Sequence, residues 1–215
     1  MDNSLSHLNR DYKEDYLLFE DMKEDPFEQF DIWFRKSMEV YRVGSNAMFL
    51  ATSDRKGRCS VRTVLLKSYD KEGLLFYTNY NSSKARDIKE NPWVSAQFHW
   101  PDMHRDIRVS GNVYKVDKKI SESYFYTRPR ESQIAVWASH QSQKIESLSR
   151  KPLERSFQEI AEKFENEKIP YPDFWGGYLI VPECFEFWQG AKNRLHDRIV
   201  YSKNQDLWQV ERLAP

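Results

Sequence analysis

The chain has 215 residues, and its 33 Lys plus Arg balance 33 Asp plus Glu, so the formal net charge is zero. This balance argues against broad capture of nucleic acid or of an acidic membrane surface, although a local basic pocket for a small anion remains compatible with it. The two cysteines, Cys59 and Cys184, lie far apart without CxxC spacing. Their spacing argues against a zinc site or a disulfide framework and favours a reducing compartment. With no secretory signal pattern and no apolar run near the roughly 20 residues that span a bilayer, we expect a cytoplasmic protein.

The N-terminal region divides at Asp25. Residues 1–24 are polar, and we expect a segment that is mobile until a ligand or partner orders it, followed by a single domain over residues 25–215. Asp25 is a capping residue type, Pro26 suits the first helical position, and Glu28 completes a capping box. The helix should end before Gly44 and bury an aromatic stripe formed by Phe27, Phe30, Trp33 and Phe34.

The remainder of the chain alternates strand and helix patterns, with strands predominating. The β-branched and aromatic runs predict strands over Ala47–Thr52, Cys59–Tyr69, Leu74–Asn79, Trp93–Trp100, Ile107–Val116, Tyr178–Val181, Phe185–Gln189, His196–Ser202 and Trp208–Leu213. Helices are predicted over Ser82–Glu90, Lys118–Tyr126, Gln133–Ser139 and Pro152–Phe164. Short polar turns ending in glycine, Asp54–Gly57 and Asp70–Gly73, are typical of hairpins. The fold class predicted is mainly β with inserted helices, as an antiparallel barrel.

A basic stretch near the C-terminus is the most informative segment. On a regular strand Arg194, His196 and Arg198 would project from one face, where three cations repel unless an anion lies over them. Two interpretations are about equally supported by the pattern: an anion site, or a solvated face with nearby carboxylate partners. Asp197 should point to the other face, as a structural partner.

The segment Arg62–Lys67 carries a cation at each end. Their odd separation would place Arg62 and Lys67 on opposite faces of a regular strand, unless a bulge intervenes. They would then serve different ligands or different ends of one ligand, and surface charge at strand ends is the plainer alternative.

Two further segments have the donors of an anion site. Ser83 and Lys84 follow a strand and open a helix, where free N–H groups favour an anion, although ordinary serine capping explains the serines equally well. Arg128 and Ser132 flank a proline and could form a phosphate cup, and an exposed basic turn is the alternative. The sequence contains no GxGxxG, P-loop, HExxH or GxSxG pattern. Mononucleotide binding would therefore need scattered side chains.

Taken together, these stretches resemble the pyridoxine 5′-phosphate oxidase family from about Pro26 to Pro215. The resemblance is carried by the order and spacing of RTVLLK, FYTN, TRPRESQI, WASHQS, FWGGY, and EFWQG followed by NRLHDR. It implies a split β-barrel that works as a homodimer with FMN at the subunit interface. It also implies oxidation of pyridoxine 5′-phosphate or pyridoxamine 5′-phosphate by O2 to pyridoxal 5′-phosphate, with no metal, nucleic acid or membrane partner.

The resemblance also implies roles for individual residues. Those that would contact FMN are Arg62, Thr63, Val64, Leu65, Leu66, Lys67, Tyr77, Thr78, Ser83, Lys84, Asp106, Gln141, Ser142, Trp188 and Arg198. Those that would contact the substrate are Lys67, Tyr124, Arg128, Ser132, Arg194, His196, Arg10 and Tyr12. Catalysis would rest on Arg194 and His196, which orient the oxidised carbon, and on Arg198, which stabilises charge on the reduced flavin.

The sequence departs from the family pattern in the segment that would bind the FMN phosphate. Ser83 stands where the family usually has Arg, and losing a charged donor costs about 1.5–3 kcal/mol, with Arg86 one helical turn later as a partial replacement. Ala135 replaces a usual Gly.

Two other departures lie elsewhere in the pattern. Asp106 replaces a Gln, and its charge would disfavour a reduced flavin unless Arg105 or Arg108 neutralises it. Asn9 stands where an N-terminal Arg is common. A second hypothesis is therefore a divergent paralogue with weakened FMN binding that acts as a pyridoxal-phosphate-binding or interaction protein.

Overall fold

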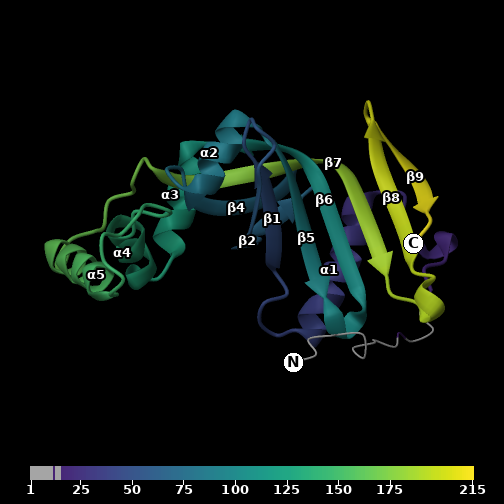
Figure 1. Cartoon of the computed structure of the whole chain (residues 1–215), viewed down its shortest axis with the longest axis horizontal. Coiled ribbons are helices and arrows are strands. Elements are labelled where there is room, and N and C mark those ends of the chain that lie inside the picture. The colour runs from purple at the N-terminus through teal and green to yellow at the C-terminus, as the bar shows by residue number, and fades with distance from the viewer. Residues whose placement is uncertain (1–11, 13–15) are drawn as a thin grey trace, which may run out of the picture. The chain divides into compact units, whose positions relative to one another are not determined.

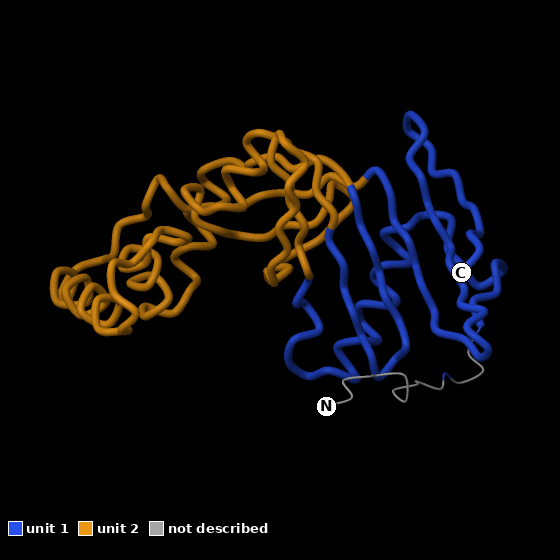
Figure 2. The backbone as a smooth tube through the Cα atoms, viewed as in Figure 1, with its two compact units in different colours: residues 1–48, 96–110, 183–215 blue, residues 49–95, 111–182 orange. Residues whose placement is uncertain are grey.

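The computed structural model describes Tyr12 and residues 16–215, which fall into two compact units (Figure 2). Unit 1 spans Met1–Met48, Ala96–Ser110 and Glu183–Pro215, and unit 2 spans Phe49–Ser95 and Gly111–Pro182. Their secondary structure (Figure 1) follows in chain order as η1 Phe19–Asp21, α1 Pro26–Val40, β1 Ala47–Ser53, β2 Cys59–Leu65, β3 Ser68–Asp70, β4 Gly73–Asn79, α2 Ser83–Glu90, β5 Trp93–Trp100, η2 Pro101–Met103, β6 Arg105–Lys115, α3 Lys118–Thr127, α4 Arg130–Ala138, α5 Lys151–Lys163, β7 Trp175–Gln189, η3 Lys192–Arg194, β8 Asp197–Asn204 and β9 Leu207–Leu213.

The strands form a sheet in the order β2-β1-β5-β6-β7-β4-β3, and β8 pairs with β7 and β9. The pair β3–β4 is antiparallel, as the Asp70–Gly73 turn predicts, and the pairs β4–β7, β7–β8 and β8–β9 are antiparallel as well. Between β1 and β2, Gly57 adopts a φ of 75°, and its N–H donates to the Asp54 carbonyl at 3.0 Å. The Asp54 carboxylate also accepts from two turn N–H groups. The predicted turn chemistry is therefore confirmed.

Helix α1 and its aromatic stripe build the core of unit 1. The Asp25 carboxylate accepts from the Phe27 N–H at 2.8 Å and Pro26 takes the first position, which confirms the predicted cap. Phe30 is fully buried and packs edge-on against Phe98 of β5, with ring centroids 5.3 Å apart. Trp33 packs in the same way against Phe187 of β7 at 5.3 Å. Phe27 is only half-buried. Aromatic contacts therefore join the helix to the sheet in this core.

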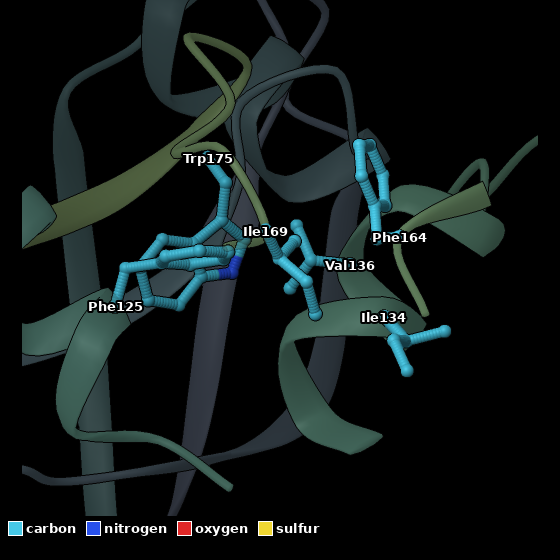
Figure 3. Close-up of a cluster of buried hydrophobic side chains, with 6 residues drawn as sticks. All are labelled: Phe125, Ile134, Val136, Phe164, Ile169 and Trp175. Atoms are coloured by element: carbon cyan, nitrogen blue, oxygen red, sulfur yellow. The ribbon is translucent and has the colours of Figure 1, made fainter. Parts of the chain in front are cut away.

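Unit 2 has a separate aromatic and aliphatic cluster among α3, α4, the end of α5 and the start of β7. Its buried members, drawn in Figure 3, are Phe125, Ile134, Val136, Phe164, Ile169 and Trp175. Phe76 of β4 stacks on Tyr178 of β7 at 5.7 Å, across the register that pairs these two residues. The cluster, with the adjoining Tyr77 ring, packs α3 and α4 against β4 and β7 within the unit. Among the described residues no helix is long and apolar enough to cross a membrane.

Three differences from the sequence prediction go beyond a shift of one or two residues at an element boundary. The strand predicted over Cys59–Tyr69 is two strands, because β2 ends at Leu65 and β3 begins at Ser68. Helix α4 starts at Arg130, three residues early, because Pro129 needs no N–H and its carbonyl accepts from the Ser132 and Gln133 N–H groups.

The two strands predicted on either side of Pro182 are one strand, β7. Strand β7 continues through Pro182 because the residue beside it on β6 is Gly111. A Cβ on Gly111 would lie 2.1 Å from the Val181 carbonyl oxygen, so glycine leaves room for the chain to pass through the proline without a break.

Candidate functional site

A cavity of about 1000 Å³ in unit 2 gathers side chains from β2, β4, α2, α3, α4 and the segment after α4. The residues that the sequence singled out and that line this cavity are Arg62, Thr63, Val64, Leu65, Lys67, Tyr77, Thr78, Ser83, Lys84, Tyr124, Arg128, Ser132, Gln141 and Ser142. Segments distant in the sequence therefore meet in one place. Leu66 is the exception in this segment, because its side chain is 3% exposed and packs in the core.

Arg62 and Lys67 line the same cavity, although a regular strand would place their side chains on opposite faces. That expectation assumed an unbroken strand, whereas β2 ends at Leu65. The backbone N–H of Lys67 then donates to the Leu75 carbonyl at 2.8 Å, so Lys67 is placed by β4 and not by the alternation of β2. The irregularity between Arg62 and Lys67 is therefore the end of β2, and not the bulge that the sequence analysis considered.

Two neighbouring cations, the buried Lys84 and the partly exposed Arg62, lie at the α2 side of the cavity. Arg62 donates to the Thr52 hydroxyl at 2.7 Å and to the Leu50 carbonyl at 3.1 Å. The Lys84 ammonium group is 6% exposed and donates to the Thr78 hydroxyl at 3.1 Å. Burial and the neighbouring Arg62 charge lower the pKa of Lys84 to about 8. Burial also lowers the pKa of Arg62, although the carboxylate of Asp87, 3.8 Å away, acts in the opposite direction. Such a pair favours an anionic ligand.

Neutral hydrogen-bonding groups continue this wall. The Gln141 side-chain carbonyl accepts from the Thr78 hydroxyl at 3.1 Å and from the Asn79 N–H at 3.3 Å. The hydroxyls of Ser83 and Ser142 lie 3.2 Å apart. Arg86, considered as a replacement for the arginine missing at position 83, donates instead to the Asn81 carbonyl at 2.9 Å.

Arg128 has an unusual environment on the α3–α4 side. Its guanidinium carbon lies 4.8 Å from the centroid of the Trp175 ring. Its Nη1 atom is buried and, in the part of the chain that the structure describes, has no hydrogen-bond partner. Burial lowers the pKa of Arg128, whereas Tyr124 acts to raise it. A buried guanidinium nitrogen without a partner is costly, and an anionic ligand would satisfy it.

An aromatic wall stands beside Arg128, and sequence reasoning found two of its members but missed Trp175. Tyr77 stacks on Tyr124 with centroids 4.0 Å apart and on Trp175 at 5.2 Å. Trp175 was not predicted as a site residue, nor was Asn79, and both line the cavity. The available signal was the Gly176-Gly177 pair after the tryptophan. A Cβ on Gly176 would lie 2.2 Å from the Tyr80 hydroxyl oxygen, so this strand end is too crowded for a side chain.

Unit 1 holds the other predicted residues. Trp188 and Arg198 face each other across β7 and β8. Arg198 donates to Glu186 at 2.8 Å, and Arg108 donates to the same carboxylate at 2.5 Å. Burial acts to raise the pKa of Glu186, but the hydrogen bonds and charges of the two arginines outweigh it and the pKa lies below its usual value. The hydrogen bond and charge of Glu186 raise the pKa of Arg198. Arg198 therefore has a nearby carboxylate partner, as the second interpretation of the basic stretch expected.

Arg194 and His196 do not lie on a strand face with Arg198, and this prediction is wrong. Residues Lys192–Arg194 form the 3-10 turn η3, Arg194 has a φ of 60°, and β8 begins only at Asp197. Arg194 is exposed. His196 accepts at Nδ1 from the Ala191 N–H at 3.1 Å, so the neutral ring carries its hydrogen on Nε2.

Of three further predicted residues within the sequence range of unit 1, the structure describes two. The Tyr12 ring stands edge-on to His196 with centroids 5.0 Å apart and near Trp188 at 5.9 Å. Asp197 accepts from the Leu17 N–H at 2.9 Å and pairs with Arg212, which confirms its structural role. Arg10, like the departure at Asn9, lies outside the described residues.

Asp106 is paired, although not with the arginines considered for it. Its carboxylate lies 2.5 Å from His99 Nδ1 and accepts from Gln97 at 3.1 Å. Arg105 donates to Gln189 at 2.7 Å, and Arg108 bonds to Glu186. His99 and Gln97 are therefore the side chains that pair with Asp106. No cluster of three or more potential metal ligands is present in the described part of the chain.

Comparison with known proteins agrees with this arrangement. The family model described as pyridoxamine 5′-phosphate oxidase matches residues 35–164, and the pyridoxine 5′-phosphate oxidase C-terminal dimerisation region matches residues 175–215. The crystal structure of PhzG from Burkholderia lata, in complex with tetrahydrophenazine-1-carboxylic acid, superposes with a TM-score of 0.85 at 27% identity, covering 94% of this chain and 99% of that one.

A pyridoxamine 5′-phosphate oxidase-related, FMN binding protein from Nostoc punctiforme has a TM-score of 0.71 at 17% identity, covering 90% of this chain and 100% of that one. The fold is thus the antiparallel split β-barrel of FMN-binding proteins, which confirms the predicted class. Relatives named pyridoxine/pyridoxamine 5′-phosphate oxidase are 45% identical in Aliarcobacter butzleri and 46% identical in Rippkaea orientalis, each over 98% of this chain and 99% of the relative. The chain belongs to the pyridoxine/pyridoxamine 5′-phosphate oxidase family.

Proposed function

We propose that this protein oxidises pyridoxine 5′-phosphate or pyridoxamine 5′-phosphate with O2 to pyridoxal 5′-phosphate, with FMN as its cofactor. The reaction releases H2O2, together with NH3 when the substrate is the amine. The observation that carries the proposal is the cavity of unit 2, which combines the buried Lys84 beside Arg62 with an Arg128 nitrogen that has no hydrogen-bond partner among the described residues. Two cationic groups around an aromatic wall suit two phosphorylated ring compounds.

The cavity fits an anionic mononucleotide. Lys84 is buried beside Arg62 with a pKa lowered to about 8, and an adjacent phosphate would remove the electrostatic cost of this pair. FMN would be held by the segment Arg62–Lys67 and by Tyr77, Thr78, Ser83, Lys84, Gln141 and Ser142, together with Asp106, Trp188 and Arg198. When bound, FMN supplies the acceptor for the hydride that leaves substrate C4′ and passes both electrons to O2, which becomes H2O2.

The protein's own residues bind and orient the substrate. Lys67, Tyr124, Arg128 and Ser132 would hold the substrate phosphate, which gives the buried Nη1 atom of Arg128 a partner. Arg194 and His196 would orient C4′, with the Nε2 hydrogen of His196 available as a donor. Arg198 would stabilise negative charge that develops on the cofactor, and Glu186 holds this guanidinium in place.

We further propose a cytoplasmic homodimer with FMN at the subunit interface and no nucleic-acid or membrane partner. The zero formal net charge supports the absence of a nucleic-acid partner. The match of residues 175–215 to a model described as a dimerisation region supports the dimer.

Spectroscopy and peroxide release test the function together. The purified protein should show a flavin absorption band and release H2O2 when pyridoxine 5′-phosphate or pyridoxamine 5′-phosphate is added. The neutral Ser83 hydroxyl at the cavity wall favours the alternative of a paralogue with weakened FMN binding. Colourless protein that binds pyridoxal 5′-phosphate yet stays inactive in excess FMN would reject the oxidase and support that alternative.

A further inference from the structure

Trp175 connects the aromatic wall to the arginine on the α3–α4 side of the cavity. Its ring is nearly parallel to those of Tyr77 and Tyr124, at interplanar angles of 13° and 8°. Phe125 packs edge-on against it at 5.7 Å. With 6% of its surface exposed, the indole ring has little freedom to move, although it still lines the cavity.

The backbone of Trp175 is held as well. Its carbonyl accepts from the Tyr171 hydroxyl at 2.5 Å, and its N–H donates to the Pro172 carbonyl at 3.2 Å. The ring therefore lies in one orientation at the beginning of β7. Figure 3 shows it beside Phe125 within the buried cluster.

Arg128 rests on this fixed ring. The guanidinium lies 4.8 Å from the indole centroid, a cation–π distance, and its Nη1 atom is buried without a hydrogen-bond partner among the described residues. No carboxylate forms an ion pair with Arg128 in the described part of the chain. A cation–π contact does not use the guanidinium N–H groups as hydrogen-bond donors to a carboxylate, whereas a salt bridge would.

We propose that Trp175 is a positioning residue for substrate: its indole ring holds the Arg128 guanidinium with its N–H groups available to the anionic group of the substrate. Trp175 also completes the stack that orients Tyr124. The inference rests on the proposed function and assigns Trp175 a part in substrate affinity, beyond its place in the core. The indole ring replaces a carboxylate as the support for Arg128 and does not compete with the substrate phosphate for the same donors.

Replacement of the indole ring tests the proposal. In Trp175→Leu the cation–π contact is lost, and KM for pyridoxine 5′-phosphate should rise about threefold to thirtyfold while kcat stays within about twofold. Trp175→Phe keeps an aromatic face and should restore most of the affinity. The same order should appear in the dissociation constant of pyridoxal 5′-phosphate from the FMN-free protein, measured by equilibrium dialysis. That second measurement applies even to a variant or a wild-type protein without turnover.

Trp137 provides a matched control. It packs against the same buried cluster, and its indole N–H donates to the Pro170 carbonyl at 2.9 Å, but it is not among the residues that line the cavity. Trp137→Leu should lower the melting temperature and leave KM and the dissociation constant unchanged. Equal losses of affinity in Trp137→Leu and Trp175→Leu would show a general packing effect and overturn the proposal.

A double-mutant cycle with Arg128→Lys addresses the mechanism. Lysine keeps the charge but lacks the planar guanidinium, so Trp175→Leu should weaken binding much less in the Arg128→Lys background than in the wild type. If the two substitutions change the dissociation constant by independent factors that simply multiply in the double variant, Trp175 and Arg128 are not coupled and the proposal is refuted. Wild-type protein that binds pyridoxal 5′-phosphate but releases no peroxide would reject the oxidase function alone, and the cycle would still be decided by dialysis.

Discussion

Lys84 is the residue whose protonation should control cofactor binding. Burial and Arg62 lower its pKa to about 8, so in the free protein it loses its proton as the pH rises through about 8. A bound phosphate favours the charged ammonium and moves its pKa upward, and binding is therefore coupled to proton uptake above pH 8. FMN affinity is therefore highest below pH 8 and falls as the pH rises above 8.

The prediction is a loss of FMN affinity approaching about tenfold per pH unit between pH 8 and the higher pKa of the complex. Titration of the FMN-free protein by quenching of flavin fluorescence measures it. Lys84→Arg is the matched control, because a guanidinium stays charged over this range and should flatten the profile. An unchanged slope in Lys84→Arg would assign the dependence to another group.

Ser83 is the second residue for which we predict an effect on FMN affinity. It lines the cavity at the first turn of α2, with its hydroxyl 3.2 Å from that of Ser142. Ser83→Arg would add a charge-assisted donor, worth about 1.5–3 kcal/mol, so FMN should bind roughly tenfold to a hundredfold more tightly. The exposed Ser147 lies outside the cavity lining, and Ser147→Arg controls for the added charge. Equal affinity in wild type and Ser83→Arg would remove this departure as a cause of weakened binding.

At the scale of elements, local signals predicted more than long-range ones. Caps, prolines and glycine turns act over a few residues, and α1 and both hairpins formed where Asp25, Gly57 and Gly73 indicated. Predictions from the alternation of side chains along a strand were less successful where contacts with an adjacent strand determine where the strand ends. Lys67 takes its place from its bond to Leu75, and the continuity of β7 depends on Gly111 of β6. Neither partner is visible from the segment itself.

The cap of α1 gives an element-scale prediction. Asp25 accepts from the Phe27 N–H at 2.8 Å, and the helix that it starts carries Phe30 and Trp33 into the core of unit 1. Asp25→Ala should lower the free energy of unfolding by about 0.5–2 kcal/mol, and the melting temperature by a few degrees. Asp25→Asn retains an acceptor oxygen and should lose much less. Calorimetry of the two variants compares them, and equal losses would show that the charge and not the cap matters.

For the whole molecule, the predicted site residues fall into two sets. One set lines the cavity of unit 2 and includes Arg128, and the other lies in unit 1 and includes Arg198. The sequence indicated which residues belong together through their resemblance to a family, but no local pattern could assign them to one subunit or two. A homodimer with FMN at its interface predicts that each site takes residues from both subunits.

Complementation between inactive variants tests this arrangement. Arg128→Gln and Arg198→Gln should each be nearly inactive as homodimers, because one loses a phosphate donor and the other the cation beside the cofactor. If each site uses Arg128 of one subunit and Arg198 of the other, a mixed dimer has one site with both arginines intact. Random mixing makes half of the dimers mixed, so about a quarter of wild-type activity should return after the variants are unfolded and refolded together. The wild type treated in the same way sets the scale. No recovery, with mixed dimers shown to be present by differently tagged chains, would mean that each site takes both arginines from one chain.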